Sequence, residues 1–304
     1  WMSGATDLAG NPRVSPSAGG ACDMGCHERP AEALTCTPEA DGVNGTAPLD
    51  VVFTAYVTGT NPSGLYYQWG FTNNSVVDVE GASRQVVTNT YGIGAWSVTL
   101  AVTNDGGEVA TTTRTNYIRV APPVLYVARS GGNSHTAPYT NWAMAASNIH
   151  AAVAAAGRGS TVWVSNGTYA ITQTIGIAEG LTLRSVGGAA NTVLLGNTTV
   201  RGFSVDHTNA LVDGFTITNC AQTGDSGGGA LLRAGRVENC RIVCNTARYG
   251  GGVYLYYEGR LKGCTISSNS VTSYGGGVCS YFNVSGSMES CAIVFSIPWT
   301  HRQS

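Results

Sequence analysis

The sequence predicts an all-β protein, in which an Ig-like β-sandwich precedes a right-handed parallel β-helix capped by one helix at its N-terminal end. Only 11% of the 304 residues are charged and 41 are glycine, a composition that favours strands and tight turns. Apolar and polar residues alternate in the middle of the chain, and a repeat follows. We therefore predict an N-terminal segment at 1–35, a sandwich at 36–121 and a β-helix at 122–304.

The charge and hydropathy of the chain exclude two classes of partner. A net charge of −2 lacks the basic face that a nucleic-acid partner requires. No apolar stretch is long enough to suggest a membrane span. Five Asn-X-Ser/Thr sequons are possible glycosylation sites, namely Asn44, Asn73, Asn166, Asn197 and Asn283.

The strand pattern of the sandwich is clearest at 96–103, Trp-Ser-Val-Thr-Leu-Ala-Val-Thr, where apolar and polar residues alternate. The hairpin-type turn Asn-Asp-Gly-Gly at 104–107 then leads into a partner strand at 108–120. Earlier strands are predicted at 51–57 and 66–71. Several short strands at this spacing are typical of a β-sandwich.

Three stretches of this region carry a family resemblance: Ala-Pro-Leu followed by Val-Phe-Thr-Ala within 47–55, Tyr-Gln-Trp-Gly-Phe at 67–71, and 89–104. Together they resemble the PKD domain, an immunoglobulin-like module of bacterial surface proteins. Gly70 stands where the family usually has an acidic residue. Such modules are mostly spacers and sometimes bind glycans, so the resemblance implies one of these two roles.

The repeat consists of Gly-Gly-Gly triplets and of cysteines spaced by about one coil. The triplets begin at Gly227, Gly250 and Gly275, at spacings of 23 and 25 residues. Such a period predicts a solenoid whose coils stack in register. Asp225 stands five residues after a cysteine, like two asparagines of later coils, so we expect it to have a turn role. The predicted stacked positions are Cys220, Cys240, Cys264 and Cys291, together with Asn245 and Asn269.

The start of the solenoid has a different residue composition from the later repeats. Residues 142–156 are rich in alanine with apolar residues at helical spacing, which predicts one amphipathic helix that caps the open end. The first regular strand is expected at 161–164. The stretches 126–133, 145–153 and 162–169 resemble the start of pectate-lyase-like β-helix domains. The later coils resemble those of large bacterial surface and autotransported proteins, which implies an extracellular or cell-surface location.

The N-terminal segment is similar to the closing segment at the C-terminal end of such β-helix domains. Two explanations remain open. The chain is a piece of a longer array, or the closing segment of one subunit caps the open β-helix of the next and builds a filament. The predicted inter-subunit residues are Asp7, Leu8, Pro12, Val14, Cys22, Met24 and Cys26.

The chain shows little sign of catalysis, so we expect no enzyme, no metal and no cofactor. Polysaccharide hydrolases need carboxylates that converge on one face, but the acids of the β-helix are widely spaced in the sequence. The histidines lack metal-ligand spacing. We expect a disulfide that joins Cys22 or Cys26 to Cys36 or to a neighbouring subunit. The widely spaced acids of the β-helix are Glu179, Asp206, Asp213, Asp225, Glu238, Glu258 and Glu289.

Aromatic residues of the later coils suggest a contact surface. Tyr254 and Tyr256 alternate with apolar residues and should point outward, and Tyr281 recurs one coil later. Exposed aromatic rings stack on sugars or on partner proteins. The predicted function is a structural subunit of an extracellular fibre or surface layer, with copies of itself as partners. The alternative is an adhesin or carbohydrate-binding fragment, and the least favoured is a polysaccharide lyase or hydrolase.

Overall fold

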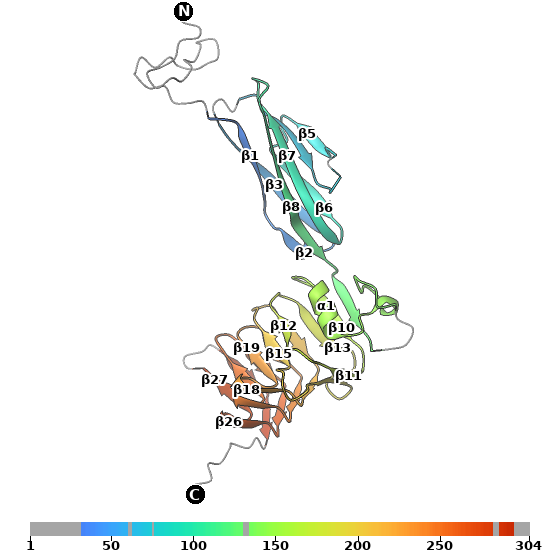
Figure 1. The fold of residues 1–304 in the computed structure, drawn as a ribbon, viewed down its shortest axis with the longest axis vertical. Coiled ribbons are helices and arrows are strands. Elements are labelled where there is room, and N and C mark those ends of the chain that lie inside the picture. Colours follow the sequence, from blue (N-terminus) through green and yellow to red (C-terminus); the bar gives the residue numbers. More distant parts are fainter. Residues whose placement is uncertain (1–31, 60–62, 75, 130–133, 282–285, 295–304) are drawn as a thin grey trace, which may run out of the picture. The chain divides into compact units, whose positions relative to one another are not determined.

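The structure, a computed structural model, describes residues 32–59, 63–74, 76–129, 134–281 and 286–294. The predicted inter-subunit residues of the N-terminal segment therefore lie outside the described residues. The chain forms two compact units, a β-sandwich and a parallel β-solenoid of about five turns (Figure 1). The all-β fold class predicted from the sequence is confirmed.

The sandwich contains two sheets. The first has the order β1-β3-β6 and consists of β1 (Thr35–Ala40), β3 (Leu49–Thr58) and β6 (Val86–Tyr91). The second has the order β2-β8-β7-β4-β5 and consists of β2 (Asn44–Thr46), β8 (Val109–Ala121), β7 (Gly94–Thr103), β4 (Tyr66–Gly70) and β5 (Val79–Gly81).

The sandwich core arises from the alternation that the sequence shows. In β7, Val98, Leu100 and Val102 are fully buried, while the residues between them are partly exposed. Trp69 of β4 is also fully buried, and its indole Nε1 donates a hydrogen bond of 2.8 Å to a backbone carbonyl oxygen. The Trp69 ring centroid lies 5.8 Å from that of Phe53 in β3. The predicted strand at 96–103 and its partner at 108–120 are confirmed.

The solenoid contains four parallel sheets, which we number in chain order. Sheet 1 consists of β9 (Val124–Val127), β10 (Thr161–Val164), β13 (Thr182–Ser185), β16 (Leu211–Asp213), β20 (Arg236–Glu238), β24 (Arg260–Lys262) and β28 (Ser287–Glu289). Sheet 2 consists of β11 (Gly167–Ala170), β14 (Thr192–Leu195), β17 (Thr216–Thr218), β21 (Arg241–Val243), β25 (Thr265–Ser267) and β29 (Ala292–Val294).

The other two sheets complete each coil. Sheet 3 consists of β12 (Ile175–Ile177), β15 (Phe203–Val205), β19 (Ala230–Leu232), β23 (Val253–Leu255) and β27 (Val278–Ser280). Sheet 4, between sheets 2 and 3 in the later coils, consists of β18 (Ala221–Ser226), β22 (Thr246–Tyr249) and β26 (Ser270–Tyr274).

Equivalent residues of successive coils stack into interior columns. In sheet 2, the register aligns Ile217 with Ile242 and Ile242 with Ile266, and all three are fully buried. Sheet 1 aligns Val237 with Leu261 in the same way. Because one coil exposes its apolar face to the next, burial in this core depends on stacking of neighbours, as expected for a solenoid.

The Gly-Gly-Gly triplets turn the chain from sheet 4 into sheet 3. Gly227 and Gly250 have φ of +69° and +57°, a region that side chains disfavour. A Cβ atom on Gly228 would lie 2.6 Å from the carbonyl oxygen of Gly251. The triplets are therefore required both by the turn and by the close approach of stacked backbones.

The predicted helix at 142–156 is wrong in its extent. A short 3-10 helix, η2 (Trp142–Met144), is separated from α1 (Ile149–Ala155) by an extended stretch. Ala146 breaks the helix because it pairs with the edge strand β9, where its amide donates 2.8 Å to the carbonyl oxygen of Tyr126. Asn148 then caps α1 through its side-chain oxygen.

The start of the solenoid also differs from the prediction. The first strand of sheet 1 is β9, which pairs in parallel with β10, the strand that the sequence placed first. Buried residues Ile149 and Ala152 of α1 join the interior of the solenoid. The helix therefore covers apolar residues of the first coils, which is the role expected of a cap.

Candidate functional site

The turns between sheets 1 and 2 place three of the predicted cysteines in one column. The register stacks Phe215, Cys240, Cys264 and Cys291 in successive coils. Cys240 and Cys264 are buried, and each sulfhydryl donates to the carbonyl oxygen two residues before it, at 3.1 and 3.4 Å. These thiols act as small apolar side chains that fill the interior.

Cys220 belongs to another column, contrary to the sequence-based prediction. Its amide donates 3.0 Å to the side-chain oxygen of Asn245, and the register aligns the residues that follow them. Asn245 in turn stacks on Asn269. Cys220 therefore occupies the position that the prediction assigned to Asp225. Burial raises the pKa of the Cys220 thiol to about 12, so it stays protonated at neutral pH.

A shared turn geometry explains this error. Turns from sheet 1 to sheet 2 and from sheet 2 to sheet 4 both use a residue with positive φ followed by an inward-facing residue. Asn239 (φ 52°) precedes Cys240 in the first kind, and Asn219 (φ 55°) precedes Cys220 in the second. The same Asn-Cys pair thus serves two structural positions, which the spacing alone does not distinguish.

Asn245 and Asn269 form a hydrogen-bonded ladder inside the solenoid. Both are fully buried. The side-chain oxygen of Asn269 accepts from the backbone amide of Asn245 at 2.9 Å and from its side-chain amide at 3.1 Å. The side-chain amide of Asn269 donates 2.8 Å to the carbonyl oxygen of Ile242. The ladder satisfies backbone groups at the turn, so its role is structural.

The predicted disulfide of Cys36 is wrong. Cys36 is a free thiol inside the sandwich, 3% exposed, and its sulfur donates 3.4 Å to the carbonyl oxygen of Leu100. Burial raises its pKa, opposed by hydrogen bonds with Thr112. Cys22 and Cys26 lie outside the described residues. All cysteines within the described part of the chain are free thiols.

An aromatic cluster lies on the outer face of sheet 3 and on the turn that follows it. Tyr254 lies between the buried Val253 and Leu255, so its side chain points outward. The ring centroid of Tyr256 lies 6.1 Å from that of Tyr254 and 4.7 Å from that of Tyr281, which is 46% exposed. We call Tyr254, Tyr256, Tyr257 and Tyr281 the tyrosine face.

The phenol groups of the tyrosine face affect one another. A hydrogen bond with Tyr257 raises the pKa of Tyr256, whose ring centroid lies 4.4 Å from that of Tyr257. Desolvation raises the pKa of Tyr254, and the neighbouring phenols of Tyr256 and Tyr281 act in the same direction. The phenols of Tyr254 and Tyr256 are therefore neutral at physiological pH and present flat, uncharged rings with hydroxyl groups.

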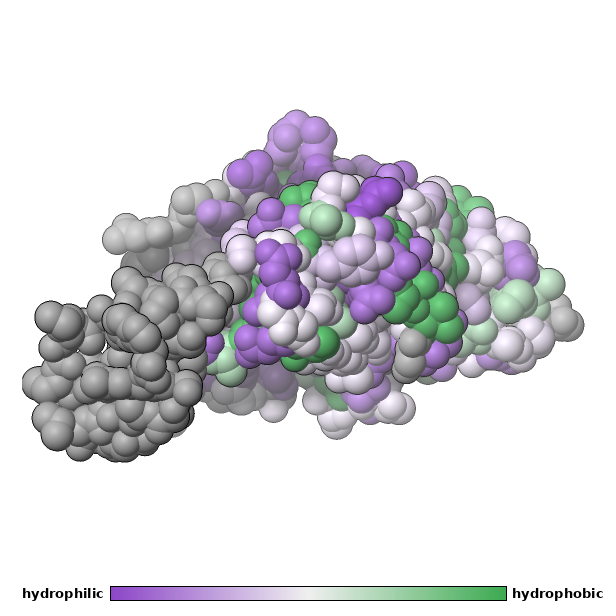
Figure 2. All heavy atoms as spheres, turned by 90° about the horizontal axis from the view of Figure 1, so that it is seen from above, coloured by the Kyte–Doolittle hydropathy of each residue, from purple (hydrophilic) through white to green (hydrophobic). Residues whose placement is uncertain are grey.

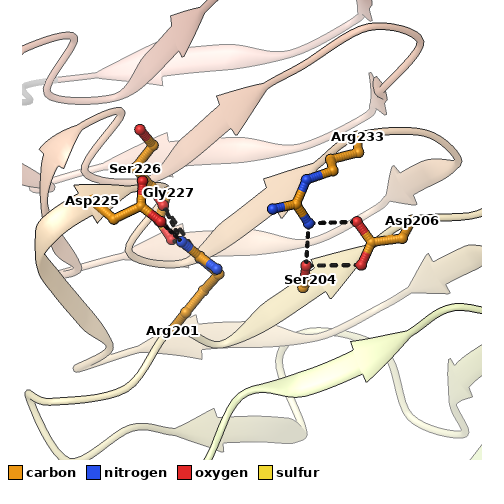
Figure 3. Close-up of polar contacts among 7 residues, drawn as sticks. All are labelled: Arg201, Ser204, Asp206, Asp225, Ser226, Gly227 and Arg233. Carbon is orange, nitrogen blue, oxygen red and sulfur yellow. Dashed lines mark hydrogen bonds and ion pairs between the residues drawn. The ribbon is translucent and has the colours of Figure 1, made fainter.

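Figure 3 shows two ion pairs that join residues of neighbouring coils. Asp225 and Arg233 of these pairs lie close enough to the tyrosine face to affect Tyr254 and Tyr256. Arg233 contacts the Asp206 carboxylate at 2.6 Å and donates 3.3 Å to the Ser204 hydroxyl. Arg201, whose side chain is 8% exposed, contacts Asp225 at 3.0 Å and donates to the carbonyl oxygen of Ser226. Asp225 thus anchors β18 through the buried guanidinium.

The stacking of sheet 1 brings together acids that are distant in the sequence. The register aligns Asp213 with Glu238, so two carboxylates lie side by side on the outer face. Each has its own cation, since Arg184 contacts Asp213 at 2.7 Å and Arg236 contacts Glu238 at 3.3 Å. The sequence could not reveal this pair, because it depends on the register between coils.

Metal-ligating side chains are not grouped in the part of the chain that the structure describes. No set of three or more histidine, cysteine, aspartate or glutamate residues there could hold a metal ion. His150 contacts the carbonyl oxygen of Gln173 at 3.0 Å, and His207 accepts from the amide of Asn209 at 3.1 Å. Both histidines thus bond to backbone groups, His150 from α1 to a residue 23 positions later and His207 within its own turn.

Four of the five sequon asparagines lie within the described residues, and each is exposed: Asn44, Asn73, Asn166 and Asn197. The side-chain oxygen of Asn197 accepts from the hydroxyl of Thr199 at 2.7 Å, and that of Asn73 accepts from the amide of Ser97 at 2.9 Å. Asn283 lies outside the described residues. Exposure makes all four accessible to modification.

The last described coil exposes side chains that face inward in earlier coils. Met288 of β28 and Ile293 of β29 are 45% and 48% exposed. Their register partners Leu261 and Ile266 are 1% and 0% exposed. Elsewhere the surface is mixed, and on the face seen in Figure 2 apolar side chains are scattered among polar ones.

Neither helix among the described residues has the length and apolar content that crossing a bilayer would require. In comparisons with protein-family models, with curated proteins and with solved structures, nothing matches this chain.

Proposed function

We propose that the protein is a structural subunit of an extracellular fibre or surface layer, in which segment 1–35 of one copy caps the terminal coil of another. One observation carries the proposal: Met288 and Ile293 are exposed although they occupy interior columns. Among the described strands, β28 and β29 are the last of sheets 1 and 2, so this coil offers apolar side chains and strand edges to a partner. The N-terminal segment supplies apolar residues, among them Leu8, Val14 and Met24.

Covering the exposed side chains supplies part of the free energy of such a contact. Fully burying a methionine or isoleucine side chain contributes about 1.5–3 kcal/mol, and about half of each is still exposed here, so covering both contributes about 2 kcal/mol. Backbone hydrogen bonds along the edges of β28 and β29 would add to this. A contact between two different surfaces of the same chain propagates unless its rotation closes a ring.

The kinship suggested by the sequence fits this role. We propose that the sandwich is a PKD-like spacer and that the solenoid is pectate-lyase-like, as in bacterial surface proteins. The motifs at 67–71 and 162–169 and the observed folds support the assignment. The exposed sequon asparagines are proposed glycosylation sites of such a protein.

Negative-stain electron microscopy of the purified chain tests the assembly. We expect filaments that disappear when residues 1–31 are deleted and when Ile293→Asp places a charge in the exposed interior column. Val294→Asp is the matched control, because Val294 is adjacent, 43% exposed and on the opposite face of β29. Monomers in every sample, or filaments that survive both changes, would refute the proposal and favour a fragment of a longer array.

The tyrosine face favours a second candidate, an adhesin that binds saccharides. Rings of Tyr256 and Tyr281 at 4.7 Å present an aromatic surface, and the nearby Arg233 and Asp206 offer hydrogen-bonding groups. A glycan screen with the monomer tests this, and Tyr256→Ala should abolish the binding. Tyr56→Ala, an exposed tyrosine of the sandwich, is the control. Calcium-dependent shortening of a pectin-like polymer would instead favour a lyase.

A further inference from the structure

A tyrosine motif recurs in two successive coils of the solenoid. Residues 249–256 read Tyr-Gly-Gly-Gly-Val-Tyr-Leu-Tyr, and residues 274–281 read Tyr-Gly-Gly-Gly-Val-Cys-Ser-Tyr. One tyrosine precedes each glycine triplet, and another ends each segment. The coil before them carries Ser226 and Arg233 at the equivalent positions. Within the described residues, the register therefore pairs tyrosine with tyrosine at both positions between these two coils alone.

Both tyrosines of the motif stack on their counterparts in the next coil. The amide of Tyr281 donates 3.0 Å to the carbonyl oxygen of Leu255, which holds Tyr281 beside Tyr256. Their ring centroids lie 4.7 Å apart, and the ring planes differ by 28°. The rings of Tyr249 and Tyr274 are nearer to parallel, at 16°, but their centroids lie 6.2 Å apart. Solvent reaches both pairs, because Tyr281 and Tyr274 are 46% and 72% exposed.

Stacked, exposed phenols have the geometry that oxidative coupling requires. A covalent bond between ring carbons of two phenols brings the ring centroids only slightly closer than the 4.7 Å between Tyr256 and Tyr281. A small rotation of the rings is therefore enough for this pair, whereas Tyr249 and Tyr274 must first approach each other. The backbone register keeps the partners adjacent, so coupling within the chain needs no encounter between molecules.

The paired tyrosines lie on the last strands of two sheets. Among the described strands, sheet 3 ends at β27 and sheet 4 ends at β26. Tyr274 is the last residue of β26, and Tyr281 directly follows β27. Strands with a neighbour on one side only open more readily than strands inside a stack. A covalent bond to the preceding coil would therefore hold the strands that open first.

We propose that Tyr256 and Tyr281 form an oxidative cross-linking site, at which hydrogen peroxide and a haem peroxidase couple them into dityrosine. Each phenol gives up one electron and one proton, and the peroxide takes up both electrons and both protons and becomes two water molecules. The two phenoxyl radicals join through ring carbons next to the hydroxyl groups, and the hydrogen on each of these carbons moves to the phenol oxygen. The product has two hydrogen atoms fewer than the two tyrosines. The site lies within one chain, so it depends neither on filament assembly nor on glycan binding.

Treatment of the dilute full chain with hydrogen peroxide and a haem peroxidase tests the site. We expect dityrosine fluorescence and the loss of two hydrogen atoms per chain, without a change in chain size on a denaturing gel. Arg260 and Lys262 lie between the two tyrosines, so trypsin separates them and mass spectrometry detects their bond as a linked pair of peptides. Tyr256→Phe and Tyr281→Phe should each abolish the Tyr256–Tyr281 link, because phenylalanine keeps the ring but lacks the phenol group.

Two control variants separate the coupling from folding and from general oxidation. Tyr56→Phe removes a tyrosine of the sandwich that is 59% exposed, and Tyr274→Phe removes one member of the wider pair. Both should leave the yield of the Tyr256–Tyr281 link unchanged. All four phenylalanine variants should keep the thermal unfolding curve of the wild type before oxidation.

Hydrogen exchange then measures what the link does. In the linked protein, amides of β26 and β27 should exchange at least about tenfold more slowly than in the unlinked protein, because a bond between coils restricts their opening. The proposal is overturned if the wild type forms no Tyr256–Tyr281 link, if dityrosine joins separate chains instead, or if these amides exchange no more slowly after linking.

Discussion

Removing the side chain of Asn269 should destabilise the later coils more than any nearby surface change. Asn269→Ala deletes the oxygen that accepts from the Asn245 amide at 2.9 Å and the amide that donates to Ile242 at 2.8 Å. Both asparagines are fully buried, so water cannot replace these bonds without entering the interior. The amide of Asn245 therefore loses its partner in a buried position.

The cost follows from the groups that lose a partner. A buried donor or acceptor left without a partner costs about 1–3 kcal/mol. Two such groups, the Asn245 amide and the Ile242 carbonyl, give about 2–6 kcal/mol for Asn269→Ala. Ser270→Ala is the matched control, because Ser270 is the next residue and is exposed. Its hydroxyl bonds to the Thr246 hydroxyl on the outside of the solenoid. We expect Ser270→Ala to cost less than about 0.5 kcal/mol.

Urea unfolding combined with hydrogen exchange measures the difference. Because solenoid coils interact mainly with their neighbours, the loss should be greatest for amides of residues 236–281 and should not reach the sandwich. The free energy of exchange of these amides should fall by the stated amount in Asn269→Ala. Equal values for Asn269→Ala and Ser270→Ala would refute the reasoning that the ladder supports the turns.

Three further predictions concern other parts of the solenoid. Gly228→Ala should lower the free energy of unfolding in urea by more than about 2 kcal/mol, because its Cβ would lie 2.6 Å from the Gly251 carbonyl oxygen. Gly224→Ala is the control and should cost much less, because a Cβ there would meet open space. Equal losses would contradict the close-approach argument. A maleimide reagent should label the exposed Cys244 rapidly. It should label the buried Cys220, whose pKa is raised to about 12, only on unfolding. Mass spectrometry of the labelled peptides checks this, and fast labelling of Cys220 would disprove its burial. Burial raises the pKa of Asp225, but the bonds to Ser226 and Arg201 outweigh it and lower the pKa. The stability that the pair with Arg201 contributes is therefore fully present above the unfolded pKa of about 3.9 and is lost as pH falls through the folded pKa. Hydrogen exchange of β18 should rise in that acid range in the wild type, and Asp225→Asn should remove this dependence.

Much of the fold follows from local patterns in the sequence. Alternation over 96–103 predicts β7 because side chains of a strand point to opposite faces, and the observed burial of Val98, Leu100 and Val102 follows it. The triplets at Gly227 and Gly250 predict recurring turns because glycine accepts positive φ. Both signals depend on a few adjacent residues, so they can be read from the sequence without knowledge of the fold.

The helix at 142–156 shows where a local pattern is overridden. Alanine spacing favours a continuous helix, but the amide of Ala146 bonds to the Tyr126 carbonyl oxygen at the edge of sheet 1. That pairing satisfies backbone groups of β9, so the chain is extended there and the helix begins only after Asn148. Tertiary pairing thus outweighs a helix propensity that differs between residues by less than about 1 kcal/mol.

The sequence by itself determined the fold class, the repeat and the outward direction of Tyr254, since each depends on local periodicity. Only the tertiary structure decided which residues of different coils are neighbours. It separated Cys220 from the column of Cys240, and it stacked Arg236 on Arg260. The physical reason is that coil lengths vary and two kinds of turn share one backbone conformation, so spacing along the chain does not define the register between coils.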